Sequence, residues 1–187
     1  MDSIALLLQG SVIVLGFMFF LWLLHFPLKN AAIVDVGWGL SLGILACFYA
    51  FHGPEPGQKS VLLSGMVSIW AIRLSSYLFF TRIYRSPEEG RYRELRRKWA
   101  DATSFKFLIF FEVQGLLNIF LSIPFLIIAL DADQNLTWKQ IAAAIVWGVG
   151  IVGETVADLQ LHFFKKKAAH EAVCDVGLWN YSRHPNY

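Results

Sequence analysis

Five long apolar runs divide the chain, at residues 4–26, 31–51, 61–80, 107–130 and 141–164. Each contains 20 to 24 residues, and a helix rising ~1.5 Å per residue needs about 20 residues to cross the hydrocarbon core of a bilayer. Turn-forming residues separate the runs, including Pro27 and the Gly- and Pro-rich stretch 52–57. This pattern predicts an all-α polytopic bundle of about five transmembrane helices, forming a single domain over residues 1–187.

Charged residues avoid the apolar runs. The five runs together hold 112 residues but only five of the 30 charged side chains, and the other 25 lie in the remaining 75 residues. A soluble helix needs a polar face, so this segregation excludes a soluble globular protein. The overall composition, 56% hydrophobic and 16% charged, points the same way. A net charge of +2 gives no indication of a nucleic-acid partner.

The basic residues of the connecting segments indicate an orientation. If the segment between the third and fourth runs is cytoplasmic, 13 Lys and Arg residues lie on that side and only Lys59 and Lys139 on the other. Cytoplasmic connections of membrane proteins carry such an excess of basic residues. We therefore expect an outside N-terminus and a cytoplasmic C-terminal tail.

Five charged residues lie inside the predicted spans: Asp35, Arg73, Glu112, Glu154 and Asp158. At ~1.5 Å per residue, all five fall within about 6–15 Å of the cytoplasmic helix ends. One interpretation is snorkelling or ion pairing, for example between Arg73 and Asp35. The interpretation we favour is a polar cavity open to the cytoplasm, because buried charge in a membrane usually serves a function. An ion-conducting protein is a third, but it predicts acids across the whole membrane depth.

Segment 82–101 carries seven basic and four acidic side chains. Such a segment is typical of a juxtamembrane helix attracted to anionic lipid, and a basic lid over an anionic cofactor fits equally well. The two cysteines, Cys47 and Cys174, lie in unlike environments 127 residues apart. We therefore expect neither a disulfide nor a Cys-based metal site, and predict no metal ligands.

The C-terminal segment 175–187 combines turn residues with hydrogen-bond donors suited to a phosphate or a ribose: Arg183, His184, Asn186 and Tyr187. An arginine can bind a phosphate through two parallel hydrogen bonds. On residue types alone, both an anion-binding turn and an ordinary cytoplasmic loop remain open.

The run GLWNYSRHPNY at 177–187 resembles the C-terminal motif of the steroid 5-alpha-reductase superfamily of membrane enzymes, especially its bacterial steroid-reductase-like branch. Supporting similarities occur along most of the chain: DVGWG at 35–39, Arg73, Tyr77 and Arg82, EGRYRELRRKW at 89–99, VQGLLN at 113–118 and GETVADLQL at 153–161.

The resemblance implies that NADPH is the cofactor and that Glu154, Asp158, Arg183, Asn186 and Tyr187 contact it, with His184 beside them as a further donor. It also implies reduction of an activated carbon–carbon double bond in a lipophilic, steroid-like substrate. A conjugated enone would need an acid or a phenol to stabilise the developing enolate oxygen.

Tyr77 and Glu112 are the candidates for that catalytic role, because both lie near the predicted polar cavity. For Glu112, the role of a buried structural acid stays open.

An Arg-His-Pro-x-Tyr element also occurs in isoprenylcysteine and phospholipid methyltransferases, so an S-adenosylmethionine-dependent membrane methyltransferase is the alternative function. The Glu154 and Asp158 pair and Asn186 favour the reductase. In the superfamily the motif continues with Gly-Glu and a further membrane helix. We therefore expect this chain to be incomplete after Tyr187, which would leave it inactive. The bacterial branch favours a bacterial inner membrane over the endoplasmic reticulum, with membrane lipid and a lipophilic small molecule as partners.

Overall fold

The computed structural model describes residues 3–54, 57–167 and 173–186. These residues form helices and turns, with no strand among them. The chain divides into two compact units, Met1–Asn135 and Leu136–Tyr187, which are described separately here. The sequence-based expectation of one transmembrane domain stays a prediction.

Five helical segments are long and apolar enough to cross a membrane, which confirms the predicted all-α, multi-pass architecture. The first unit contains α1 (Ser3–Leu28), α2 (Ile33–His52) and α3 (Gln58–Leu78), and then a π-helical turn η1 (Phe79–Ile83) and the short helix α4 (Gly90–Trp99). A 3₁₀ turn η2 (Ala100–Ala102), α5 (Thr103–Leu121) and α6 (Ile123–Ala129) complete it. The second unit contains α7 (Trp138–Lys167) and the 3₁₀ turn η3 (Gly177–Asn180).

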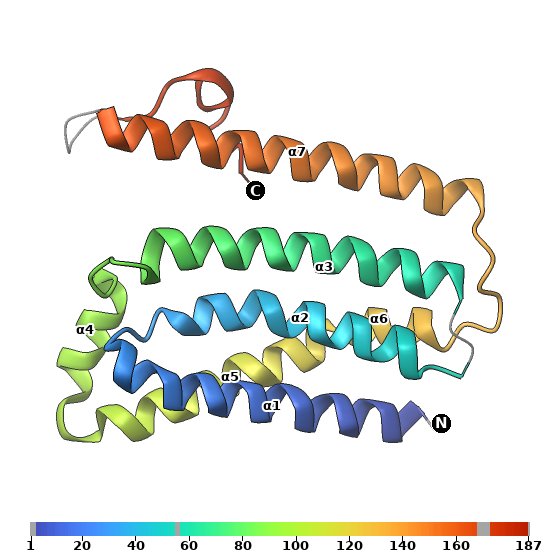
Figure 1. The fold of residues 1–187 in the computed structure, drawn as a ribbon, viewed down its shortest axis with the longest axis horizontal. Coiled ribbons are helices and arrows are strands. Elements are labelled where there is room, and N and C mark those ends of the chain that lie inside the picture. The colour runs from blue at the N-terminus through green and yellow to red at the C-terminus, as the bar shows by residue number, and fades with distance from the viewer. Residues whose placement is uncertain (1–2, 55–56, 168–172, 187) are drawn as a thin grey trace. The chain divides into compact units, whose positions relative to one another are not determined.

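Helix α2 is the centre of the first unit, packed against α1, α3 and α5 (Figure 1). Small residues let α3 approach it closely. A Cβ atom added at Gly43 would lie only 3.0 Å from the Ala71 Cβ atom of α3. Ser75 of α3 donates a hydrogen bond to the Val36 carbonyl of α2 (2.9 Å). This combination of small residues and side-chain hydrogen bonds is typical of helix packing in membranes, where lipid removes most of the hydrophobic driving force.

The predicted run 107–130 is two helices instead of one, with a break at Ser122. Pro124 has no N–H to offer to the preceding turn, so it starts a new helix within its first two positions. The Ser122 hydroxyl donates to the Ile119 carbonyl (2.8 Å) and meets one of the backbone acceptors at the end of α5. The fourth span is therefore interrupted next to Pro124.

The polar connections of the first unit gather at the two ends of its helices. Residues 29–32 and α4 lie at one end, and the last turn of α2 and the segment after α6 lie at the other (Figure 1). At the second end, Lys59 pairs with Asp131 (3.0 Å) and joins the start of α3 to the end of α6. The segment with most of the basic residues therefore shares one end with the α1–α2 connection.

Candidate functional site

The C-terminal tail folds back on α7 and is fixed there by two hydrogen bonds. The Leu178 amide donates to Gln160 Oε1 (2.9 Å), and the Trp179 indole donates to the Ala157 carbonyl (2.8 Å). Gly177 makes this approach possible. Its φ of 60° lies in the left-handed region, and a Cβ atom there would lie 2.3 Å from Gln160 Nε2. The motif thus has a local structural reason to begin with glycine.

This fold-back brings together two residues that the sequence predicted to share a site. Asn186 Nδ2 donates to Asp158 Oδ1 at 2.9 Å, although the residues are 28 positions apart. The Asp158 residue is 5% exposed. The other amide atom, Asn186 Oδ1, is buried, and no residue in the described ranges donates a hydrogen bond to it. An unmatched buried acceptor is costly, so a donor at this position would stabilise the folded tail.

The other predicted cofactor-binding residues differ in their burial. Glu154 is half-buried one helical turn before Asp158 on α7. Arg183 and His184 are exposed in the tail, where the His184 amide donates to the Ser182 hydroxyl (3.1 Å). Tyr187 lies outside the described residues.

These residue types fit a dinucleotide. A buried amide acceptor beside a carboxylate can bind ribose hydroxyls or a carboxamide N–H, and an exposed arginine can bind phosphate. Within the described residues no group of three or more His, Cys, Asp or Glu side chains is arranged to hold a metal ion.

The two predicted catalytic residues belong to different helices of the first unit. Tyr77 is half-buried on α3, where Arg73 lies 6.0 Å from its ring centroid. Glu112 is half-buried on α5 and has no hydrogen-bond or ion-pair partner among the described residues. Helices α3 and α5 pack on different faces of α2 (Figure 1). The structure therefore does not group Tyr77 with Glu112, and their catalytic roles stay predictions.

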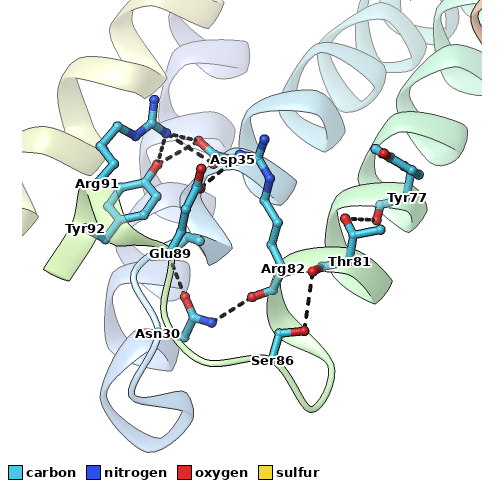
Figure 2. Close-up of polar contacts among 10 residues, drawn as sticks. Asn30, Asp35, Tyr77, Thr81, Arg82, Ser86, Glu89, Arg91 and Tyr92 are labelled. Atoms are coloured by element: carbon cyan, nitrogen blue, oxygen red, sulfur yellow. Dashed lines mark hydrogen bonds and ion pairs between the residues drawn. The ribbon is translucent and has the colours of Figure 1, made fainter. Parts of the chain in front are cut away.

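A polar cluster at the α4 end of the first unit is centred on Asp35 (Figure 2). Its carboxylate accepts hydrogen bonds from Arg82 (3.0 Å), Arg91 (3.1 Å) and the hydroxyl of Tyr92 (2.7 Å). Arg82 also pairs with Glu89 at 3.1 Å. Two acids thus face two arginines, so the cluster is close to neutral and holds α4 against α2 and η1.

Arg73 was the expected example of a partner for Asp35, and Tyr92, which is fully buried, was not expected in this cluster. The signal was present in α4. Tyr92, Leu95 and Trp99 are spaced three and four residues apart in an otherwise charged helix, a stripe that predicts a buried face. The many charged residues of α4 made this apolar stripe easy to miss.

The acids of segment 82–101 also pair with three more of its basic residues. Glu88 accepts two hydrogen bonds from the Arg96 guanidinium (3.1 and 2.9 Å), and Glu94 pairs with Arg97 (2.9 Å) and Lys98 (3.5 Å). Burial raises the pKa of Glu88, but the hydrogen bonds and charge of Arg96 and the Ala31 amide outweigh it, and the net pKa lies below its ordinary value. Most of the positive charge of the segment is therefore balanced locally.

Among curated proteins and solved structures, none matches the chain. Residues 21–187 match the family described as "Protein of unknown function (DUF1295)". That range includes α2 to α7, the Asp35 cluster, the Asp158–Asn186 contact and the tail. The chain therefore belongs to the DUF1295 family, which is part of the steroid 5-alpha-reductase-like superfamily.

Proposed function

We propose that the protein is an NADPH-dependent membrane reductase that acts on an activated carbon–carbon double bond of a lipophilic, steroid-like substrate. The observation that carries the proposal is the contact of Asn186 with Asp158, in which the buried amide oxygen of Asn186 has no partner among the residues that the structure describes. Membership of the superfamily supports the same reaction class. NADPH, when bound, would supply the hydride.

Residues of the chain would bind the cofactor, donate the proton and stabilise the developing negative charge. Asp158 and Asn186 would accept hydrogen bonds from the ribose or the nicotinamide amide, and Arg183 would bind a phosphate from its exposed position. Tyr77 and Glu112 are the candidates for donating the proton and for stabilising negative charge on a carbonyl oxygen. Glu154, His184 and Tyr187 would complete the cofactor site.

Binding of the cofactor to the full-length protein in detergent tests the proposal directly. Arg183→Ala should weaken NADPH binding by about 1.5–3 kcal/mol, the usual contribution of a hydrogen bond to a charged group. The loss should be larger for NADPH than for NADH if Arg183 contacts the 2′-phosphate. Cofactor fluorescence during titration gives both affinities.

Lys139→Ala is the matched control, because it removes one positive charge from the start of α7, away from the tail motif. It should leave NADPH binding unchanged. Saturable binding of S-adenosylmethionine, with none of NADPH, would contradict the reductase and favour the methyltransferase.

A further inference from the structure

A cavity lies at the α4 end of the first unit, apart from the Asp35 cluster. It has a volume of about 370 Å³ and is lined by His25, Phe26, Lys29, Glu88 and Arg96. The first two belong to the last turns of a membrane-spanning helix, α1. The cavity therefore lies at the level where the hydrocarbon core gives way to lipid headgroups.

Its charge favours an anion. The carboxylate of Glu88, whose side chain is 8% exposed, already accepts hydrogen bonds from Arg96 and from the Ala31 amide (2.8 Å). Arg96 is further fixed by the ring of Phe107, 5.1 Å from its guanidinium carbon. Glu88 is thus fully engaged, and Lys29 adds a positive charge that no acid among the lining residues is free to balance.

Lys29 also has a strained backbone. Its φ is 50°, a left-handed conformation that glycine usually supplies at the end of a helix. The surrounding hydrogen bonds are those of such a helix end: the Lys29 amide donates to Phe26 O (3.2 Å) and the Asn30 amide to His25 O (3.3 Å). Strain of this kind is frequent at ligand-binding positions.

His25 lines the cavity from inside the fold. The residue is 1% exposed and packs between Phe26, Phe107 and Phe111. Its Nδ1 atom donates to the Trp22 carbonyl. Nε2 is then the ring nitrogen left to hydrogen-bond a ligand hydroxyl or phosphate.

An apolar track leads from the cavity along α1. Phe26 is 45% exposed, and its ring contacts that of Trp22, which in turn contacts Phe19 (centroids 5.3 and 5.4 Å apart). Leu23 is exposed beside them. Spacings of three and four residues place these side chains on one face of the helix, long enough to lie along an acyl chain. A soluble phosphate compound has no acyl chain to contact these side chains.

We propose that this cavity is a binding site for an anionic phospholipid, with Lys29 and Arg96 contacting the phosphate, His25 a headgroup hydroxyl, and the Phe19–Phe26 face of α1 an acyl chain. The probe is a fluorescent short-chain phosphatidylglycerol, and the readout is its polarisation with the full-length protein in neutral detergent. Lys29→Gln should reduce its affinity by about tenfold or more, the worth of one charge-assisted hydrogen bond. Arg93→Gln removes the same charge from an exposed position of α4 and should have little effect.

Lys29→Gly separates binding from folding. Glycine relieves the left-handed strain, so the variant should melt at a higher temperature than the parent while binding the lipid as weakly as Lys29→Gln. Equal losses in Lys29→Gln and Arg93→Gln would indicate diffuse attraction and overturn the proposal, as would unchanged binding in both. Competition by sn-glycerol 3-phosphate as strong as that by the lipid would assign the cavity to a soluble phosphate compound. Equal affinity for phosphatidylcholine would remove the requirement for an anionic headgroup.

Discussion

Single polar side chains tie together segments of the first unit that lie far apart in the sequence. Asn30 donates to the Arg82 carbonyl (2.9 Å), Glu88 accepts from the Ala31 amide, and the Trp22 indole donates to the Ser104 carbonyl (3.0 Å). The Arg82 carbonyl and the Ala31 amide lie at a helix end and in a connection, where regular helical bonding stops. At the edge of a membrane such groups are costly to leave unmatched. These residues therefore position the α4 end of the unit.

Glu88 makes the stability of this end depend on pH. The pKa of Glu88 is depressed in the folded protein, so the ionised carboxylate stabilises the fold at pH values above 4.5, the ordinary pKa of the group. That contribution is lost as the pH falls through the lower, folded-state pKa. Glu88→Gln should therefore lower the melting temperature at neutral pH and reduce its further fall on acidification. Thermal unfolding of the detergent-solubilised protein across this pH range measures both effects.

Glu94→Gln serves as the comparison, because Glu94 pairs with exposed Arg97 and Lys98 on the surface of α4. Surface pairs contribute little, so its acid profile should match that of the parent. Identical profiles for the two variants would show that Glu88 is not the group responsible.

At the scale of the elements, apolar runs were sufficient to predict the spans because lipid imposes a length and a composition on each. The helix ends were harder. Helix α1 continues through Pro27 to Leu28, and α5 begins at Thr103, four residues before its apolar run. The π turn at Phe79–Ile83 has no simple sequence signature. Yet it ends α3 and carries Arg82, one of the residues that contacts Asp35.

The close contact of α2 with α3 depends on the absence of a side chain at Gly43. A leucine there would collide with Ala71, whose Cβ lies 3.0 Å from the position of an added Cβ. Overpacking of this kind costs about 1–3 kcal/mol, so Gly43→Leu should lower the melting temperature. Gly65→Leu on α3 is the matched control, because a Cβ there meets nothing within 4 Å. If both substitutions destabilise equally, the effect comes from the helix backbone and not from the contact.

At the scale of the whole molecule, the sequence predicted that polar chemistry would gather toward one end of the spans. The first unit has its Asp35 cluster and its lipid-level cavity at the α4 end, and the second unit holds Asp158 against Asn186. The resemblance assigned Asp158 and Asn186 to one cofactor site. The structure joins these two side chains by a hydrogen bond, and their contact with a cofactor stays a prediction. Tyr77 and Glu112 were grouped because both were expected near the polar cavity. The position of a residue along its helix does not reveal which face of α2 that helix covers. The hydrogen-bond partners of Asp35 could not be predicted from the sequence, because two of them, Arg91 and Tyr92, lie on α4.

The last prediction concerns sidedness. If all five segments cross the membrane, 13 Lys and Arg residues of the connections and tail lie on one side and two on the other. We therefore expect α4 and the tail to share one aqueous compartment. Arg93→Cys, in a chain with Cys47 and Cys174 replaced by serine, reports on α4. Native Cys174, in a chain lacking Cys47, reports on the tail, and Ala132→Cys reports on the opposite side. A membrane-impermeant thiol reagent applied to sealed vesicles of one orientation should label the first two together and the third only from the other side.

A tail labelled together with Ala132→Cys would mean that α7 does not cross the membrane. In that case a dinucleotide arriving from the cytoplasm could not reach Arg183, and the proposed cofactor site would have to be abandoned.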